Sequence, residues 1–548
     1  MKKTIDSYFL LFVCCAFGVL ILGLGNYGLA ETSEARYAEI SREMVVSGDY
    51  LNPKLLGVFH FHKPPMVYYI TTLGYRIFGV NEFGARFFLQ VAIAVQLLLI
   101  YGMANLLFTD KKIAFVSGII YFTMPIVIIS SRNLTTDAFL TTFILTSIYC
   151  WQYYTIKLKV LFLYLFYVFV GLALLTKGPV ALLFILTYII AYKFIFKKKS
   201  NINVHHIIGF LLCLTIGASW YLMVIADNPK LWNYFVEKQL VARMNSKAYN
   251  RSKPFWFYLP LIVGLLFPWW LGILPKLKSR FSQLSGMNQQ NRLLLMAAFA
   301  LFILFSMFST KLIMYILPVF WMLAIFIASQ LQTMPLVSRK IITIGFLSFS
   351  ALLCAALVIF YGLDLESVHV SILPVIVGFL ALVIVLVVNF FIQDSHRLKP
   401  VLLAAVFSVS LLLISSQIFN KNNSLINSTK QIVDFTKSMS GDNKNTIFVY
   451  DYLLSSIPFY TDAEFITLKF NHDTTEREIQ FQNDDSWKEH LWDMNDKQIV
   501  SKVNERFKYK NTYLFVRNAK DLDQEFYFLK ENFKRKKMFP KWTIYYND

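Results

Sequence analysis

Thirteen apolar segments, most of them close to twenty residues long, recur between Tyr8 and Phe419 and constrain the fold more than any other feature. A membrane-spanning helix needs about 20 predominantly apolar residues to cross a hydrocarbon core about 30 Å thick. The pattern therefore predicts a polytopic α-helical membrane protein with about thirteen transmembrane helices. The predicted spans cover residues 8–28, 86–108, 113–130, 138–156, 160–175, 178–196, 206–226, 256–274, 293–308, 313–330, 341–361, 372–392 and 401–419.

Composition agrees with this prediction and excludes a soluble enzyme, a fibrous protein and a disordered tail. Of 548 residues, 56% are hydrophobic and 16% are charged, whereas soluble domains carry about 25% charged residues. The net charge is +20, but residues 1–420 carry 33 Lys and Arg against 14 Asp and Glu, whereas residues 421–548 carry 20 against 19. The excess positive charge belongs to the membrane part, so membrane lipids rather than nucleic acid are the expected partner.

Short basic clusters occupy alternate connections between the spans. By the positive-inside rule these connections are cytoplasmic. The N-terminus is then cytoplasmic, and an odd number of spans puts the loops 29–85 and 227–255 and the C-terminal residues 421–548 on the outer side. The clusters are Lys2-Lys3, Lys111-Lys112, Lys157 with Lys159, Lys197 to Lys199, Lys276 to Arg280, Arg339-Lys340, and Arg397 with Lys399.

Two domains are predicted, a membrane domain over residues 1–420 and a small α/β domain outside the membrane over residues 421–548. The second begins with an amphipathic helix near residues 424–438. Runs of β-branched and aromatic residues then predict strands. These runs are Thr446–Tyr450, Phe465–Leu468, Tyr513–Val516 and Thr543–Tyr546.

The first outer loop contains an amphipathic helix that ends near Gly48. Tyr37, Ile40 and Met44 recur at helical spacing and form one apolar face. The acids and arginines of this segment have two interpretations. Either they carry chemistry, or they are the paired charges of a helix lying in the membrane interface, which is the stronger interpretation for Glu39, Arg42 and Glu43.

Lys63 precedes Pro64 and Pro65, which suit the start of a new helix. It fits equally well a functional cation and a lysine that reaches toward lipid headgroups. His60 and His62 lie just before it, and with no third ligand evident they are interpreted as solvated loop histidines. The five cysteines lack the spacing of a metal or redox site.

Asp137 is the only acid between Lys111 and Ala226. Ionisable residues at membrane margins are costly and often functional. A helix N-cap is the alternative, and the Thr135-Thr136-Asp137 context also fits it.

An ordered series of motifs covers the first 320 residues. It consists of Glu34–Met44 with Ser47-Gly48-Asp49, His62-Lys63-Pro64, Phe78-Gly79 with Phe83–Arg86, Asp137, Thr176-Lys177-Gly178, Pro254–Pro260, Phe267-Pro268-Trp269, and Lys311-Leu312 with Tyr315–Pro318. This series resembles the polytopic glycosyltransferases that use polyprenyl-phosphate sugar donors and have the type C glycosyltransferase fold. The similarity is greatest to the lipid A aminoarabinose transferases, which are related to the protein O-mannosyltransferases.

The resemblance implies transfer of a sugar from a polyprenyl phosphate, such as undecaprenyl phosphate, at the periplasmic face of a bacterial inner membrane. The acceptor would be lipid A, another glycolipid, a glycan or a protein. The matching positions make Arg36, Lys63, Lys311 and Tyr315 the predicted donor phosphate-binding residues. Glu34 and Asp137 are the predicted catalytic carboxylates, which accept the acceptor's proton or position the reactants.

Two positions depart from the aminoarabinose branch. That branch begins its first motif Asp-Glu, where this chain has Ser33-Glu34, so Glu34 is the first substitute for the aspartate and Glu31 the second. The family's zinc-binding glutamate and histidine align with His62 and Arg251. No metal ligand is therefore predicted, and a divalent metal is the only cofactor left open.

The alternative function is a transporter or flippase of a lipid-linked sugar, because thirteen spans alone would suit one. A transporter would place its ionisable residues near the bilayer midplane, whereas here they cluster in the outer loops. The basic loop 227–255 has two interpretations, a lid over the cavity or a surface that binds lipid headgroups.

Overall fold

The computed structural model describes residues 2–198, 202–241, 253–276, 286–363, 368–440, 445–470 and 472–547. Each of the thirteen predicted spans overlaps a helix, although residues 22–28 of the first and 266–268 of the eighth lie outside helices, and the helix over the predicted span 138–156 is not among the candidate spans that follow. Among the described residues, eight helices are long and apolar enough to cross a membrane, or nine if the bent pair α5 and α6 is one span. Three shorter apolar helices, Ile5–Ile21, Val180–Phe196 and Phe255–Leu265, fall on further predicted spans. The chain is a multi-pass membrane protein.

The chain divides into two compact units, which we call the helical unit (residues 1–24 and 87–418) and the mixed unit (residues 25–86 and 419–548). The division groups the first predicted outer loop with the C-terminal part. The predicted boundary at residue 420, between a membrane domain and a domain outside the membrane, stays a prediction.

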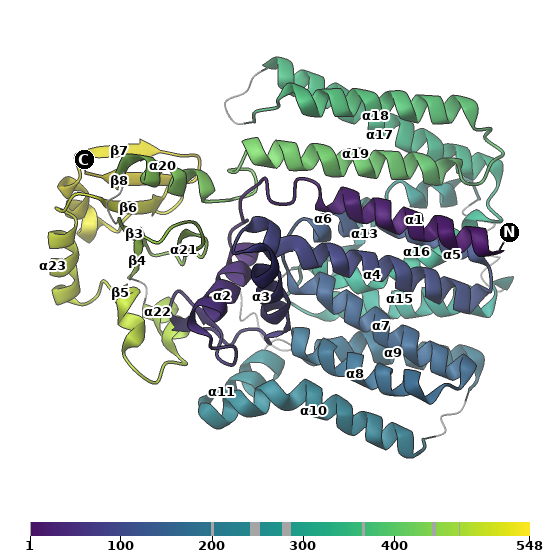
Figure 1. Cartoon of the computed structure of the whole chain (residues 1–548), viewed down its shortest axis with the longest axis horizontal. Coiled ribbons are helices and arrows are strands. Elements are labelled where there is room, and N and C mark those ends of the chain that lie inside the picture. The colour runs from purple at the N-terminus through teal and green to yellow at the C-terminus, as the bar shows by residue number, and fades with distance from the viewer. Residues whose placement is uncertain are drawn as a thin grey trace. The chain divides into compact units, whose positions relative to one another are not determined.

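The helical unit is built from long apolar helices (Figure 1). Pro125 at the start of α6 separates it from α5, and the two helices meet at 62°. The elements are α1 Lys2–Ile21, α4 Glu82–Phe108, α5 Lys111–Phe122, α6 Pro125–Ser131, α7 Thr136–Lys157, α8 Val160–Lys177, α9 Val180–Phe196, α10 Val204–Asp227, α11 Lys230–Asn233, η1 Tyr234–Val241, η2 Phe255–Phe257, α13 Tyr258–Leu265, η3 Trp269–Lys276, α15 Gln289–Met307, η5 Ile313–Val319, α16 Phe320–Leu331, α17 Leu336–Leu363, α18 Ile372–Phe391 and α19 Lys399–Lys421.

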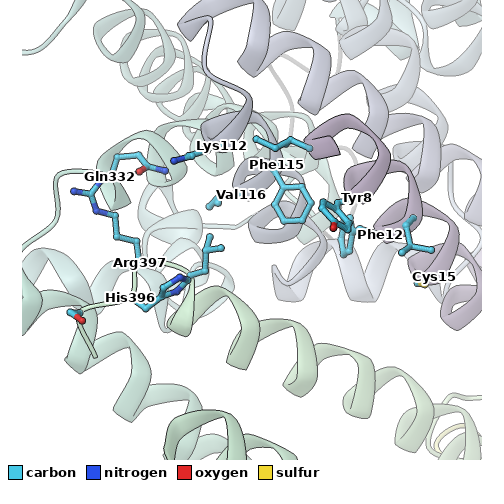
Figure 2. Close-up of a pocket in the computed structure, with 13 residues that line it drawn as sticks. Tyr8, Phe12, Cys15, Lys112, Phe115, Val116, Gln332, His396 and Arg397 are labelled. Atoms are coloured by element: carbon cyan, nitrogen blue, oxygen red, sulfur yellow. Dashed lines mark hydrogen bonds between the residues drawn. The ribbon is translucent and has the colours of Figure 1, made fainter. Parts of the chain in front are cut away.

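A groove of about 870 Å³ opens in the helical unit, and apolar side chains line most of it. Figure 2 shows Tyr8 and Phe12 of α1 and Phe115 of α5 beside one another, with His396 and Arg397 from the segment before α19. Lys112, which belongs to a basic cluster predicted to be cytoplasmic, also lines the groove. Among the predicted site residues of the helical unit, Asp137, Lys311 and Tyr315 do not line the groove.

The mixed unit contains a six-stranded sheet in the order β5-β4-β3-β6-β8-β7 (Figure 1). The first four strands of that order are parallel, and β8 and β7 are antiparallel additions. The strands are β3 Thr446–Tyr450, β4 Glu464–Lys469, β5 Leu491–Asp493, β6 Thr512–Arg517, β7 Arg535–Met538 and β8 Trp542–Tyr546. Because β3 and β6 are central and buried on both faces, they consist of near-continuous apolar runs.

The remaining elements of the mixed unit are α2 Ser33–Ser47, β1 Lys54–Leu55, β2 Val58–Phe59, α3 Met66–Phe78, α20 Lys430–Ser440, α21 Ile457–Tyr460, α22 His472–Ile479, η6 Ser486–Glu489, α23 Lys497–Arg506 and η7 Gln524–Asn532. The fold class predicted from the sequence is confirmed, including all four predicted strands. The helix predicted near residues 424–438 begins six residues later, at Lys430.

Candidate active site

Helix α2 carries the first group of predicted site residues. Its predicted apolar face is confirmed, since Tyr37, Ile40 and Met44 are all buried. The helix ends at Gly48, whose φ of 71° lies in the left-handed region that glycine adopts most readily. A short turn and α3, which begins directly after Pro65 as predicted, follow in the same unit.

Three charged residues of α2 are structural. Arg42 donates two hydrogen bonds to the buried Glu39, at 2.7 and 2.8 Å. Glu43 accepts hydrogen bonds from the backbone N–H groups of Leu56 and Gly57 in the β1-β2 turn. The interpretation as paired charges therefore holds for Glu39 and Arg42, whereas Glu43 is held by backbone N–H groups of the same loop.

Glu34 is also held by a protein partner. Arg86 donates from Nε to Glu34 Oε1 and from Nη2 to Oε2, both at 2.8 Å, and both side chains are almost completely buried. The backbone N–H of Ala30 donates to Oε2 at 2.8 Å. Both carboxylate oxygens thus serve the packing of the first loop, which argues for a positioning role rather than for proton transfer.

Glu31 has fewer hydrogen-bond partners than Glu34. The backbone N–H of Ser456 donates to Glu31 Oε1 at 2.8 Å, whereas Oε2 is buried without a hydrogen-bond partner. Burial raises the pKa of Glu31 from 4.5 to about 7, and the hydrogen bonds from Ser456 and the charge of Arg36 offset only part of that rise. A carboxyl group with such a pKa can accept a proton at neutral pH.

Arg36 and Lys63 lie in the same unit. The Nε of Arg36 is buried and has no hydrogen-bond partner. Burial lowers the pKa of His60 far below its ordinary value, and the charges of Arg36 and Lys63 contribute to that shift. Both cations therefore lie within electrostatic reach of His60. The interpretation of His60 as solvated is wrong, because its side chain is only 5% exposed.

Asp137 belongs to a second group, in the helical unit. Lys177 Nζ donates to Asp137 Oδ1 at 2.5 Å and lies 4.1 Å from the centre of the Tyr315 ring. Gly178 ends α8 with a φ of 72° and so places Lys177 in the last turn. The N-cap alternative for Asp137 is wrong, because Thr135 is the N-cap of α7 and Asp137 lies in the first helical turn.

Lys311 differs from the other predicted cations. Its Nζ donates to the backbone carbonyls of Lys253, at 3.0 Å, and Phe308, at 2.5 Å, and the side chain is buried. These bonds fasten the segment before η5 to the start of η2. Lys311 is therefore held in place by backbone acceptors, and Tyr315 contacts Lys177 rather than Lys311.

The structure thus divides the predicted site residues between the two units. Glu34, Arg36 and Lys63 belong to the mixed unit, and Asp137, Lys311 and Tyr315 to the helical unit. The sequence alone did not give a role to Lys177 or Arg86, although both lie in the motifs quoted above. Of the basic loop predicted as a lid, residues 242–252 lie outside the described residues.

The chain is similar in sequence to several known glycosyltransferases. Residues 62–223 match the family model for dolichyl-phosphate-mannose-protein mannosyltransferase. Curated relatives include an undecaprenyl phosphate-alpha-4-amino-4-deoxy-L-arabinose arabinosyl transferase of Proteus mirabilis, 32% identical over 45% of each chain. The enzyme of that name in Aeromonas salmonicida is 30% identical over 60% of this chain and 59% of its own. The chain spans about half the length of the first curated relatives it matches.

The crystal structure of ArnT from Cupriavidus metallidurans bound to undecaprenyl phosphate superposes on 98% of this chain and 98% of its own, with a TM-score of 0.77 and 20% identity. The chain has the type C glycosyltransferase fold. The predicted resemblance to this superfamily is confirmed. The apo form of ArnT gives a TM-score of 0.76 over the same shares. The type C fold therefore covers 98% of the chain and includes C-terminal residues that carry no quoted motif.

Proposed function

We propose that this protein is a glycosyltransferase that moves a sugar from undecaprenyl phosphate to an acceptor. The observation that carries the proposal is the match over 98% of the chain to a structure that was solved with undecaprenyl phosphate bound. The names of the curated relatives, which are undecaprenyl phosphate-aminoarabinose arabinosyl transferases, support the same donor class. Lipid A or another envelope glycolipid is the proposed acceptor.

The reaction joins an acceptor oxygen or nitrogen to the anomeric carbon of the sugar. The bond from that carbon to the phosphate oxygen breaks, and its electron pair stays on the released undecaprenyl phosphate. Because this leaving group is already an anion, the protein needs fixed positive charge rather than a general acid. Arg36 suits this role, since its buried Nε lacks a protein partner and a guanidinium can bind two phosphate oxygens. Lys63 is the second proposed cation.

The proton leaves the acceptor as the new bond forms, and we assign it to Glu31. Its pKa of about 7 and its unpaired Oε2 support this assignment over Glu34. Glu34 becomes a positioning residue, because Arg86 holds both of its oxygens. If the acceptor is itself a phosphate, it is already nucleophilic and Glu31 would position it instead.

In the helical unit, Asp137, Lys177 and Tyr315 form the second proposed part of the site. The hydrogen bond to Asp137 holds the ammonium group of Lys177 above the Tyr315 ring. Such a cation can contact the phosphate or the sugar. The hydrogen bonds of Lys311 to two backbone carbonyls favour a supporting role, in which it holds the segment that leads to Tyr315.

We further propose a bacterial inner-membrane location with the N-terminus in the cytoplasm and residues 421–548 in the periplasm. The alternating basic connections support this orientation. It places Glu31, Arg36, Lys63 and Asp137 on the periplasmic side. A cysteine introduced at the exposed Tyr509 should react with a membrane-impermeant maleimide in spheroplasts, whereas one at Lys157 should not.

The test of function is transfer in vitro by purified protein in detergent or proteoliposomes. Undecaprenyl phosphate carrying aminoarabinose and other sugars is offered with lipid A, other glycolipids, glycans and peptides. We expect a labelled glycolipid product and release of undecaprenyl phosphate. Arg36→Ala should abolish transfer, whereas Arg76→Ala, which removes an arginine bonded to Tyr50 in the same unit, should retain it. Movement of the donor across the bilayer without any transfer would favour the flippase instead.

A further inference from the structure

Two histidines and a glutamate come together in the mixed unit, outside the residues proposed for transfer. One ligand atom from each of His60, His62 and Glu478 lies within 4.8 Å of the other two. His60 and Glu478 are buried and His62 is half-buried. The imidazole rings of His60 and His62 stand edge to face with their centres 4.2 Å apart. We propose that these three side chains bind a divalent metal ion, with zinc as the best fit.

Local structure explains how the two histidines reach one point. The β1-β2 turn reverses the chain, and the backbone N–H of His60 donates to the carbonyl of Pro53 at 2.7 Å. The chain then runs through His62 to the two prolines that start α3. His60 and His62 are thereby held in a short ordered segment rather than on a solvated loop.

The third ligand comes from far along the sequence. Glu478 lies in the last turn of α22, and Phe481 just beyond that helix packs against the histidine segment. The centre of the Phe481 ring is 5.6 Å from that of Phe61 and 5.9 Å from that of His62, at interplanar angles of 87° and 69°. This aromatic contact keeps the end of α22 beside the histidines without any ion.

The donor set indicates the metal. Two imidazole nitrogens with one carboxylate oxygen suit zinc, which takes three protein ligands and leaves a fourth position for water or another ligand. Bond lengths of about 2.0–2.2 Å in a tetrahedron place ligand atoms about 3.3–3.6 Å apart. Small rotations of the three side chains would close the cluster to that size. Magnesium and calcium are less suitable, because they prefer sites made of oxygen ligands.

Arg477 competes with a metal ion for Glu478. It donates from Nη2 and Nε to Glu478 Oε1, at 2.5 and 3.1 Å. Both hydrogen bonds use one oxygen, and the Arg477 side chain is 57% exposed. Glu478 can therefore keep Arg477 on one oxygen and offer the other to the ion, or release Arg477 into solvent.

This ligand set differs from the one implied by the family resemblance. The family's zinc ligands align with positions 62 and 251, and position 251 holds an arginine here. The proposed site shares only position 62 with the family and takes Glu478 from α22 of the mixed unit. A bound ion would fasten the segment before α3 to α22, and so fix the backbone next to Lys63.

Metal content of the full-length protein tests the site directly. The protein is purified without a polyhistidine tag, stripped with EDTA, equilibrated with zinc chloride and desalted, and bound zinc is measured by mass spectrometry. We expect about one zinc per chain, and an increase in the unfolding temperature when zinc is restored. Addition of cobalt(II) should give the visible absorption of a four-coordinate site.

Variants assign the ligands. His62→Ala and Glu478→Gln should each lower zinc affinity more than about tenfold. Glu476→Gln, an exposed carboxylate on the same helix, is the matched control and should bind zinc like the wild type. Wild-type protein that holds less than about a tenth of an equivalent of zinc after equilibration would overturn the site. Unchanged affinity in Glu478→Gln would overturn it as well. Because the readout is metal content, a failure here is distinct from a failure to transfer sugar.

Discussion

Arg86 binds both carboxylate oxygens of Glu34 at 2.8 Å inside the mixed unit, where neither side chain is exposed to more than 1%. The same guanidinium donates to the carbonyls of Tyr27 and Gly28, each at 2.9 Å, and lies 3.9 Å from the centre of the Tyr27 ring. The pair therefore fastens the start of the first loop to the start of α4. Glu34, in the first motif of the series, therefore stabilises the fold of this loop.

Glu34→Gln should consequently destabilise the protein. Removing one partner of a buried ion pair costs about 3–5 kcal/mol, because the other charge is left uncompensated. We expect a lower unfolding temperature and faster proteolysis, with Arg86→Met behaving alike. Activity per folded molecule should fall only modestly. A stable, fully folded Glu34→Gln protein without transfer activity would instead make Glu34 the proton acceptor.

Glu31→Gln, in contrast to Glu34→Gln, should remain folded but lose transfer activity. Because the pKa of Glu31 is about 7, the wild-type rate with a hydroxyl or amine acceptor should rise as the pH increases through about 7 and the carboxyl group loses its proton. The variant should keep a low rate that lacks this step. The measurement is kcat/KM from about pH 5.5 to about pH 8.5, a range that brackets the titration of such a group.

The free energy of unfolding should also depend on the titration of Glu31, and it should fall as the pH rises. The pKa of Glu31 is raised on folding from 4.5 to about 7, so the folded state binds this proton more tightly than the unfolded state. The resulting stabilisation is complete below about pH 4.5 and is lost as the pH rises through about 7, by at most about 3 kcal/mol. Denaturation of the wild type and Glu31→Gln across that range measures the difference. Equal slopes in the two proteins would contradict the raised pKa.

Much of the fold could be predicted because it depends on local pattern. Apolar length located the spans, and buried runs such as Thr512–Arg517 located the central strands. The edge strands were missed for physical reasons. β5 has three residues, and β7 reads Arg-Lys-Lys-Met with every side chain exposed, so its pairing with β8 provides the only signal.

The candidate site was less predictable, because the role of each side chain depends on hydrogen-bond and ion-pair partners that are distant in the sequence. The motif around Glu34 does not reveal that Arg86, 52 residues later, occupies both of its oxygens. Asp137 and Lys177 are likewise 40 residues apart. The two histidines showed no third ligand in the sequence because Glu478 follows more than 400 residues later, although the mixed unit contains all three. Residue type and spacing along one segment could not supply these pairs.

The pair of Asp137 and Lys177 gives a prediction for the helical unit. If Lys177 acts through its charge above Tyr315, Lys177→Met and Asp137→Asn should each lower kcat/KM by at least about tenfold. The double variant should lose little more than the worse single variant, because the two side chains act as one unit. Lys157→Met, on the exposed end of α7, is the control. Losses that add fully in the double variant would show that the two residues act independently.

Arg36 and Lys63 should be distinguishable by the geometry of phosphate recognition. Arg36→Lys keeps a positive charge but loses the two-pronged contact, so we expect it to lose transfer almost as strongly as Arg36→Met. Lys63→Arg should retain more activity than Lys63→Met, because a lysine contributes chiefly a point charge. Competition by undecaprenyl phosphate, measured as its inhibition constant, reports binding apart from chemistry. Both methionine variants should weaken that inhibition by about tenfold or more, whereas Arg76→Met should leave it unchanged. Inhibition that is equally strong in Arg36→Met and in the wild type would remove Arg36 from the phosphate site, and transfer lost without weaker inhibition would place its effect on the sugar or the acceptor.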